Sequence, residues 1–214
     1  MKDQSKNVFV GISLSNKNLT VRSFTEINEI AIDELEARRV RYLIADEIDL
    51  VNMRLFEGGE ENALRRKLER RARDIEFMIS QASKKSLKSI VECVRWRDVL
   101  NKEYWDIYFV VNNSFAYDPQ FRADVREIAA MYAARREKRI SESELTYLCG
   151  YILQELPTLL IGLNVNNKRY RAMIYPSYEA ESLTVIVEAM YSGKYDMRIN
   201  ADRRINIKRY EIGI

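Results

Sequence analysis

The feature that most constrains the fold is an alternation of short apolar runs with longer segments of helical periodicity. Residues 7–12, Asn-Val-Phe-Val-Gly-Ile, form a β-branched run that predicts a strand with Ser13 at its carboxyl end. From about Thr25 to Arg39 the apolar residues recur at a mostly helical spacing, and Tyr42 to Asp46 then resembles a buried strand. These segments predict a strand, a helix and a second strand.

The alternation continues after Gly58-Gly59, which is expected to break the chain. A long helix should follow, with Leu64, Leu68, Ile75 and Ile79 on its apolar face. The remaining expected elements are a strand at Leu87 to Val94, two helices separated by Asp118-Pro119, a helix from Ser141 or Ser143 to about Gly162, a strand from Tyr170 to Tyr175 ending at Pro176, and a helix from Leu183 to Tyr191. Strands that alternate with helices predict an α/β fold with a mostly parallel sheet covered on both faces. The basic tail from Arg198 to Ile214 is β-like but has no assigned place in that sheet.

The length of the chain suits one well-cored domain spanning residues 1–214, because 214 residues are too few for two substantial domains. No apolar run approaches the roughly 18 residues that a membrane span requires, and residues 1–7 are polar with no signal core behind them. We therefore expect a soluble, cytoplasmic protein with no membrane partner. Cys93 and Cys149 are isolated in apolar stretches and are expected in the core.

The chain has no histidine at all. This absence excludes Ser-His-Asp and Cys-His catalysis as well as histidine-based zinc sites. The sequence also lacks a glycine-rich phosphate loop of the Walker or dinucleotide type. No metal and no cofactor are expected.

Ser13 is the first candidate for chemistry. Ligands of doubly wound sheets sit beyond the carboxyl ends of the strands, and Ser13 directly follows such an end. Gly11 would let a substrate approach the backbone closely. An ordinary turn or a helix cap is the alternative interpretation of Gly11-Ile12-Ser13.

A second candidate group lies near the end of the helix expected before Gly162. Tyr151 and Glu155 are four residues apart, so they share one side of that helix, and Pro157 would leave a carbonyl free beside them. A carboxylate in this apolar stripe needs a partner or a positive ligand, either a structural arginine or a bound ammonium group. Tyr175, at the end of its strand, would point into the same crevice, although core packing is an alternative role.

The long helix after Gly58-Gly59 is strongly basic. It carries six cations in nine residues: Arg65, Arg66, Lys67, Arg70, Arg71 and Arg73. Arg66, Arg70 and Arg73 form a stripe on one face, which could neutralise the phosphates of a nucleic-acid backbone. A solvated helix face is the alternative.

Together these motifs resemble the cyclodipeptide synthase family. The resemblance rests on Gly-Ile-Ser-x-x-Asn at residues 11–16 and, more specifically, on Tyr-x-x-x-Glu-x-Pro at residues 151–157. Supporting matches are Ala45-Asp46-Glu47, Arg95-Trp96, Asp118-Pro119-Gln120-Phe121-Arg122 and Tyr175-Pro176, which cover nearly the whole chain in the expected order.

The resemblance implies a single Rossmann-like domain similar to the catalytic domain of class Ic aminoacyl-tRNA synthetases. It also implies an ATP-independent enzyme that joins the acyl groups of two aminoacyl-tRNAs into a cyclic dipeptide. Ser13 would carry the aminoacyl and dipeptidyl intermediates, Tyr151 and Glu155 would hold the first ammonium group, and Tyr175 would relay protons. The same resemblance places Gly11 and Asn16 around the nucleophile, Phe9 and Met173 in the first aminoacyl pocket, and tRNA on the basic helix.

The proton acceptor for Ser13 is not set by the resemblance, and a substrate hydroxyl or Glu155 are the leading candidates. Two other functions compete with the synthase. A serine acyltransferase or hydrolase of small activated esters would use Ser13 without needing the basic helix. A non-enzymatic tRNA-binding module would give Ser13 and Glu155 no chemical task.

Overall fold

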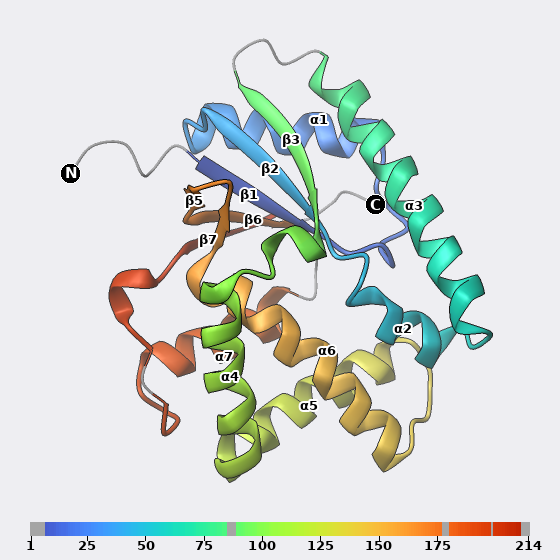
Figure 1. Ribbon diagram of the computed structural model, residues 1–214, viewed down its shortest axis with the longest axis vertical. Helices are drawn as coiled ribbons and strands as arrows, with labels where there is room; N and C mark the ends of the chain where they lie inside the picture. The colour runs from blue at the N-terminus through green and yellow to red at the C-terminus, as the bar shows by residue number, and fades with distance from the viewer. Residues whose placement is uncertain (1–6, 85–88, 177–179, 198, 211–214) are drawn as a thin grey trace.

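The computed structural model describes residues 7–84, 89–176, 180–197 and 199–210. Within these residues a five-stranded sheet has the order β3-β2-β1-β6-β7, and every neighbouring pair is parallel (Figure 1). Its strands are β1 (Asn7–Ile12), β2 (Arg39–Ile44), β3 (Ile90–Arg95), β6 (Ala172–Pro176) and β7 (Asn206–Tyr210). A separate antiparallel hairpin joins β4 (Leu163–Val165) to β5 (Lys168–Tyr170).

Helices cover both faces of the sheet, as Figure 1 shows. The helices are α1 (Val21–Glu29), α2 (Asp49–Phe56), α3 (Glu61–Ser83), α4 (Lys102–Tyr117), α5 (Pro119–Arg135), α6 (Glu142–Ile161) and α7 (Ala180–Tyr191). Successive side chains of a strand point to opposite faces. Accordingly, Val8 and Val10 join the core formed with α1 and α3, whereas Phe9 joins the core formed with α4 to α7. The predicted fold class is confirmed.

The order of the strands creates a switch point beside β1. The chain runs outward from β1 to β2 and β3, and later fills the other side with β6 and β7. Crossovers therefore leave in opposite directions on the two sides of the β1–β6 pair, which is where α/β sheets form a ligand crevice. Ser13 follows β1 and Tyr175 lies at the end of β6, so this crevice lies between them.

The expected helix from Thr25 to Arg39 differs from the observed one. Thr20 caps α1 with its side chain, and a π-helical turn at Ile30–Glu34 follows the helix. The helical stretch then ends, with Glu36 in the left-handed region (φ 50°), and β2 begins at Arg39. The strand was expected from Tyr42, and charged residues conceal its earlier start: Arg41 is only 3% exposed and pairs with Glu92 of the neighbouring strand.

Other expected boundaries hold closely. The structure confirms the Asp118 start of α5, the Ser141 cap of α6 and the glycine after its end, Gly162. The strand expected at Leu87 begins at Ile90 in the structure, and Leu87 itself lies outside the described residues. Sequence reasoning missed α2 and the β4–β5 hairpin, and it left β7 unplaced, since the charged strand Asn-Ile-Lys-Arg-Tyr has little apolar signal. Arg198 and residues 211–214 of the tail also lie outside the described ranges.

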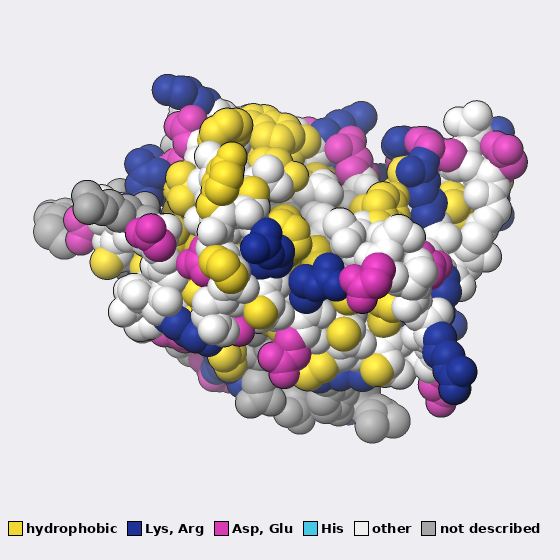
Figure 2. Space-filling model, turned by 90° about the horizontal axis from the view of Figure 1, so that it is seen from below, with side chains coloured by type: hydrophobic (Ala, Val, Ile, Leu, Met, Phe, Trp, Pro, Cys, Tyr) yellow, Lys and Arg dark blue, Asp and Glu magenta, His cyan; other side chains and the backbone are white. Residues whose placement is uncertain are grey.

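The surface and the cysteines add two further observations. Figure 2 shows the lower end of the molecule, where hydrophobic side chains lie among charged ones, and α4 exposes Trp105 by 49% and Phe109 by 68%. Across the residues that the structure describes, none of the helices combines the length and apolar character needed to cross a membrane. Cys149 is buried as expected, whereas Cys93 is only half-buried.

Candidate active site

A cavity of about 330 Å³ lies at the carboxyl ends of β1, β2 and β6. Seven of the residues predicted from the sequence line it: Gly11, Ser13, Asn16, Tyr151, Glu155, Met173 and Tyr175. The switch point of the sheet thus brings together residues from β1, α6 and β6 that are far apart in the sequence. Phe9 does not line this cavity, since it is fully buried in the core below Gly11.

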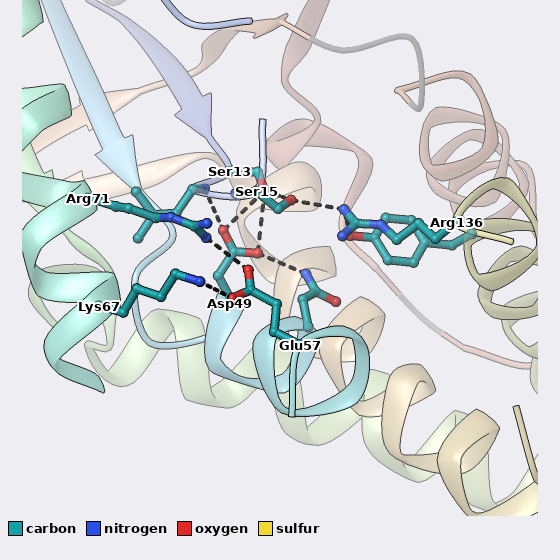
Figure 3. Close-up of polar contacts among 10 residues, drawn as sticks. Ser13, Ser15, Asp49, Glu57, Lys67, Arg71 and Arg136 are labelled. Carbon is teal, nitrogen blue, oxygen red and sulfur yellow. Dashed lines mark hydrogen bonds and ion pairs between the residues drawn. The ribbon is translucent and has the colours of Figure 1, made fainter. Parts of the chain in front are cut away.

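Ser13 lies in a network of hydrogen bonds (Figure 3). Its hydroxyl donates toward Asp49, with Oγ 3.1 Å and 3.3 Å from the two carboxylate oxygens. Ser15 lies on the other side, with its Oγ 2.8 Å and its backbone nitrogen 3.3 Å from Ser13 Oγ. The serine is therefore held between a carboxylate acceptor and hydrogen-bond donors.

Asp49 is the first residue of α2 and lies behind Ser13, away from the cavity. It is 1% exposed, and its carboxylate also accepts from the backbone N–H of Leu14 and, over 2.8 Å, from Asn52 Nδ2. Burial raises the pKa of the Asp49 carboxyl, and the hydrogen bonds from Asn52, Leu14 and Ser13 offset only part of that effect. Asp49 is thus a buried acid in direct contact with the candidate nucleophile.

Arg136, which ends α5, reaches the same network. Its guanidinium donates to Ser15 Oγ over 3.0 Å and lies above the rings of Tyr132 and Phe56, 4.5 Å and 4.8 Å from their centroids. The Tyr132 ring in turn stacks on Tyr151 at 6.2 Å. Aromatic packing thereby fixes the position of the cation beside the two serines.

The second group of candidates forms the opposite wall of the cavity. The Tyr175 hydroxyl donates to Glu155 Oε1 over 2.7 Å, which links β6 to α6. Tyr151 lies one turn before Glu155, and burial, followed by the negative charge of Glu155, raises its pKa well above the ordinary value. Tyr151 is therefore a neutral phenol beside a carboxylate, and its hydroxyl oxygen can accept a hydrogen bond, an arrangement that suits an ammonium ligand.

Gly11, Met173 and Asn16 shape the region around Ser13. A Cβ atom on Gly11 would lie 2.7 Å from Met173 Cε, so the absence of a side chain at position 11 leaves room for the methionine in the cavity wall. Asn16 accepts from the backbone N–H of Asn18 over 3.0 Å, and its amide lies 3.5 Å from the Pro176 carbonyl. Asn16 thereby connects the turn after β1 to the end of β6.

A basic groove adjoins the cavity. It has a volume of about 730 Å³, and its six arginines outnumber its four acids: it is lined by Arg65, Arg66, Arg70 and Arg73 of α3 with Arg95 and Arg97, and by Asp46, Glu47, Glu69 and Glu76. Neighbouring residues line the two hollows: Ala45 and Trp96 face the cavity, whereas Asp46 and Arg95 face the groove. Arg95 also pairs with Asp46 at 3.0 Å, so two of the motifs noted in the sequence meet at this border.

The six cations between Arg65 and Arg73 of α3 fall into three pairs. Lys67 and Arg71 both pair with Glu57 and do not line the groove (Figure 3). Arg65 and Arg73 line the groove but pair with acids one turn away, Glu61 and Glu69. Arg66 and Arg70 are exposed, and within the described ranges neither has an ion-pair partner. Arg66 and Arg70 therefore present the most available charge.

Sequence reasoning missed three residues of the site: Asp49, Ser15 and Arg136. Asp49 follows Asp46 and Glu47 and resembles part of an exposed acidic turn. Its flanking residues, Ile48 and Leu50, were the one local sign of burial, and both are buried. Nothing in the sequence indicated that α2 would begin there and place the carboxylate against Ser13.

Comparison with known proteins identifies the family. The family model described as cyclodipeptide synthase matches residues 1–203. No curated protein sequence matches the chain. Among the solved structures that resemble it, the cyclodipeptide synthase of Staphylococcus haemolyticus has a TM-score of 0.74 at 19% identity, covering 94% of this chain and 89% of that one.

Two further structures support the comparison. The cyclodipeptide synthase of Bacillus thermoamylovorans has a TM-score of 0.74 at 18% identity, covering 94% of this chain and 86% of the other. The synthase of Candidatus Glomeribacter gigasporarum, solved bound to Phe-tRNAPhe, has a TM-score of 0.60 at 13% identity over 100% and 90% of the two chains. At such identities these structures show a shared fold. The family model matches most of the sequence as well, so this chain belongs to the cyclodipeptide synthase family.

Proposed function

We propose that this protein joins the acyl groups of two aminoacyl-tRNAs into a cyclic dipeptide, a 2,5-diketopiperazine, with Ser13 as the nucleophile. The observation that carries the proposal is that Ser13, Tyr151, Glu155 and Tyr175 line one cavity. Membership of the cyclodipeptide synthase family supports it, as does the similar structure that was solved with Phe-tRNAPhe bound.

The first step is a transfer between esters. Ser13 Oγ attacks the carbonyl carbon of an aminoacyl-tRNA, the bond to the tRNA ribose breaks, and the ribose hydroxyl leaves with the proton that the serine lost. Because the ester is already activated, the step needs no ATP. Glu155 and Tyr151 would hold the ammonium group, the carboxylate by charge and the neutral tyrosine through its hydroxyl.

The later steps use the captured amine. Deprotonated, the amine attacks the ester of a second aminoacyl-tRNA and forms a peptide bond, and the second tRNA leaves. The new terminal amine then attacks the Ser13 ester, which closes the six-membered ring and returns the serine hydroxyl. Each attack releases a proton from nitrogen, and the hydrogen-bonded Tyr175 and Glu155 are positioned to pass it on. Tethering the first acyl group raises its effective concentration for the second reaction.

The basic groove is the proposed site for the tRNA backbone. Since it shares a border with the cavity, a phosphate chain in the groove could deliver its acyl end to Ser13. Such a groove has no obvious use in a hydrolase of small esters. Aminoacyl-tRNAs are cytoplasmic, and we propose that the protein acts there, without metal or cofactor.

Substitution of Ser13 tests the proposal. Cells that express the protein should release a cyclic dipeptide that mass spectrometry of the medium identifies, and purified protein should become labelled by tRNA charged with radiolabelled amino acids. Ser13→Ala should abolish both the product and the label. Ser192→Ala is the matched control, because Ser192 is exposed and outside the cavity. Normal labelling of Ser13→Ala would contradict the assignment.

A further inference from the structure

The hydrogen bonds around Ser13 have a consistent direction. Ser13 has one hydroxyl proton, and its geometry donates that proton to Asp49. In the contact between the two serines Ser15 is then the donor, and Ser15 itself accepts from Arg136 over 3.0 Å. The chain of donors thus runs from Arg136 through Ser15 and Ser13 to the carboxylate of Asp49, which Figure 3 shows.

We infer that Asp49 is the general base that activates Ser13, an inference that rests on the proposed function. Both of its oxygens lie within hydrogen-bond range of Ser13 Oγ, at 3.1 Å and 3.3 Å. Glu155, in contrast, is held on the far wall by Tyr175 and faces the proposed ammonium site. The position of Asp49 behind the serine leaves the cavity side of Oγ open to the ester carbonyl.

The proton balance of the step is simple. As Ser13 Oγ bonds to the carbonyl carbon, its proton passes to Asp49. The tetrahedral intermediate carries the serine oxygen and the ribose oxygen on one carbon, so the ribose oxygen departs close to the same carboxyl and takes the proton from it. Asp49 ends the step ionised, as it began. Ser15 stabilises the charge that develops on Oγ by donating a hydrogen bond, and Arg136 orients Ser15.

The environment of Asp49 suits this task. Burial favours the neutral acid, which makes the ionised form a stronger proton acceptor than an exposed aspartate. The charged or titratable side chains that face it are Arg136 after α5 and Tyr151 of α6. Guanidinium groups stay charged in proteins, and the raised pKa of Tyr151 keeps that phenol neutral. Asp49 is therefore the group of this set that changes charge at acidic pH.

Asp49→Asn is the decisive variant. The amide keeps the shape of the side chain and an oxygen for the Leu14 and Ser13 contacts, but it cannot take up a proton. The rate of Ser13 labelling by total tRNA charged with radiolabelled amino acids, measured in a single turnover, should fall by about 100-fold or more. Retention of the same tRNA on filters should stay within about two-fold of the wild type. The control is Asp33→Asn, an exposed aspartate distant from the site, which should label at the wild-type rate.

The pH dependence of Ser13 labelling distinguishes an Asp49 that acts as a base from one with only a structural role. Labelling by the wild-type protein should decline toward acidic pH as Asp49 becomes protonated. Asn52→Ala removes a donor that stabilises the charged form, so the pKa of Asp49 should rise and the decline should move to higher pH. A decline that originates in Glu155 or in the ammonium group of the substrate would not move, because the side-chain amide of Asn52 donates to Asp49.

The outcomes distinguish this inference from the proposed function. If Ser13→Ala is unlabelled and Asp49→Asn labels within about three-fold of the wild type, Asp49 is not the base although Ser13 is the nucleophile. If Ser13→Ala is labelled normally, the proposed function itself fails. If thermal unfolding shows that Asp49→Asn does not fold, the pH profile of Asn52→Ala is the test. If its labelling declines at the same pH as in the wild type, the inference is overturned.

Discussion

At the scale of single residues, the cavity wall depends on one close approach. Gly11 has no side chain, and Met173 Cε occupies the space that a Cβ atom would need. Both residues line the cavity beside Ser13, so the shape of the proposed acyl pocket depends on this pair. The atom that a Cβ at position 11 would meet is the flexible end of the Met173 side chain, which can shift at little cost.

We predict that Gly11→Ala narrows the pocket and lowers the yield of cyclic dipeptide, because the new methyl group and the displaced end of Met173 need space in the cavity wall. Met173→Leu removes the Cε atom with a nearly conserved volume, so it should cost less than about 1.5 kcal/mol of stability. In that background the additional effect of Gly11→Ala should be smaller. Product yields of the four proteins, measured by mass spectrometry, form a double-mutant cycle. Strictly multiplicative effects would mean that the two positions are not coupled.

At the scale of elements, helix caps position the site. Arg136 lies at the end of α5, and Tyr151 and Glu155 are carried by α6. The N-terminus of α5 is set by Asp118, whose side chain accepts the backbone N–H groups of Gln120 and Phe121 over 2.9 Å and 3.0 Å. Pro119 at the first helical position fits the same pattern. These caps therefore set the ends of the helices that carry, or lead into, the candidate site residues.

Asp118→Ala should destabilise the protein by about 1 kcal/mol, the usual loss for an N-cap. Hydrogen bonds from Phe121 and other backbone N–H groups lower the pKa of Asp118 in the folded state. Because folding lowers this pKa, the ionised carboxylate stabilises the folded state. This stabilisation is complete above the pKa of the unfolded chain, about 3.9, and is lost as the pH falls through the pKa of the folded protein. The difference in unfolding free energy between the variant and the wild type should therefore shrink at strongly acidic pH. Denaturant unfolding of both proteins at neutral and at acidic pH measures this difference.

The control for this prediction is Asp106→Ala. Asp106 is exposed in the interior of α4 and caps no helix. It should change stability by less than about 0.5 kcal/mol. A difference for Asp118→Ala that grows toward acidic pH would contradict the assigned role of the cap.

At the scale of the whole molecule, the distribution of charge matters more than its sum. The 35 basic and 32 acidic residues leave a formal charge of only +3. Four arginines of α3 nevertheless gather along a groove next to the candidate active-site cavity, whereas Lys67 and Arg71 pair with Glu57. A weakly charged protein can in this way present a strong local site for phosphates.

We predict that the triple variant Arg66→Ala, Arg70→Ala and Arg73→Ala binds tRNA more weakly. The dependence of log affinity on log salt should also become shallower by up to about three, roughly one for each phosphate that an arginine no longer neutralises. Binding assays at a series of salt concentrations measure both quantities. The comparison variant is Lys67→Ala with Arg71→Ala, in which the removed cations were already paired with Glu57, so its slope should change much less. An unchanged slope in the triple variant would place the tRNA elsewhere.

Much of the fold could be predicted because the relevant signals are local. Apolar runs indicated β1 and β6, and Asp118-Pro119 and Gly162 marked helix ends that the structure confirms. Charge hid the start of one strand: β2, expected from Tyr42, begins at Arg39. β2 contains Arg41, which is buried only because Glu92 and Tyr170 contact it from other parts of the chain. β7 was unplaced for a similar reason.

By itself the sequence determined most of the alternation of strands and helices, the exclusion of histidine chemistry, and the motifs around Ser13 and Glu155, because periodicity, composition and spacing are properties of the chain alone. Only the tertiary structure decided that Asp49 contacts Ser13, that Arg136 reaches Ser15, and which arginines line the groove. The physical reason is burial: an acid in an ordinary acidic turn becomes a candidate base only when packing removes it from water and places a hydroxyl beside it.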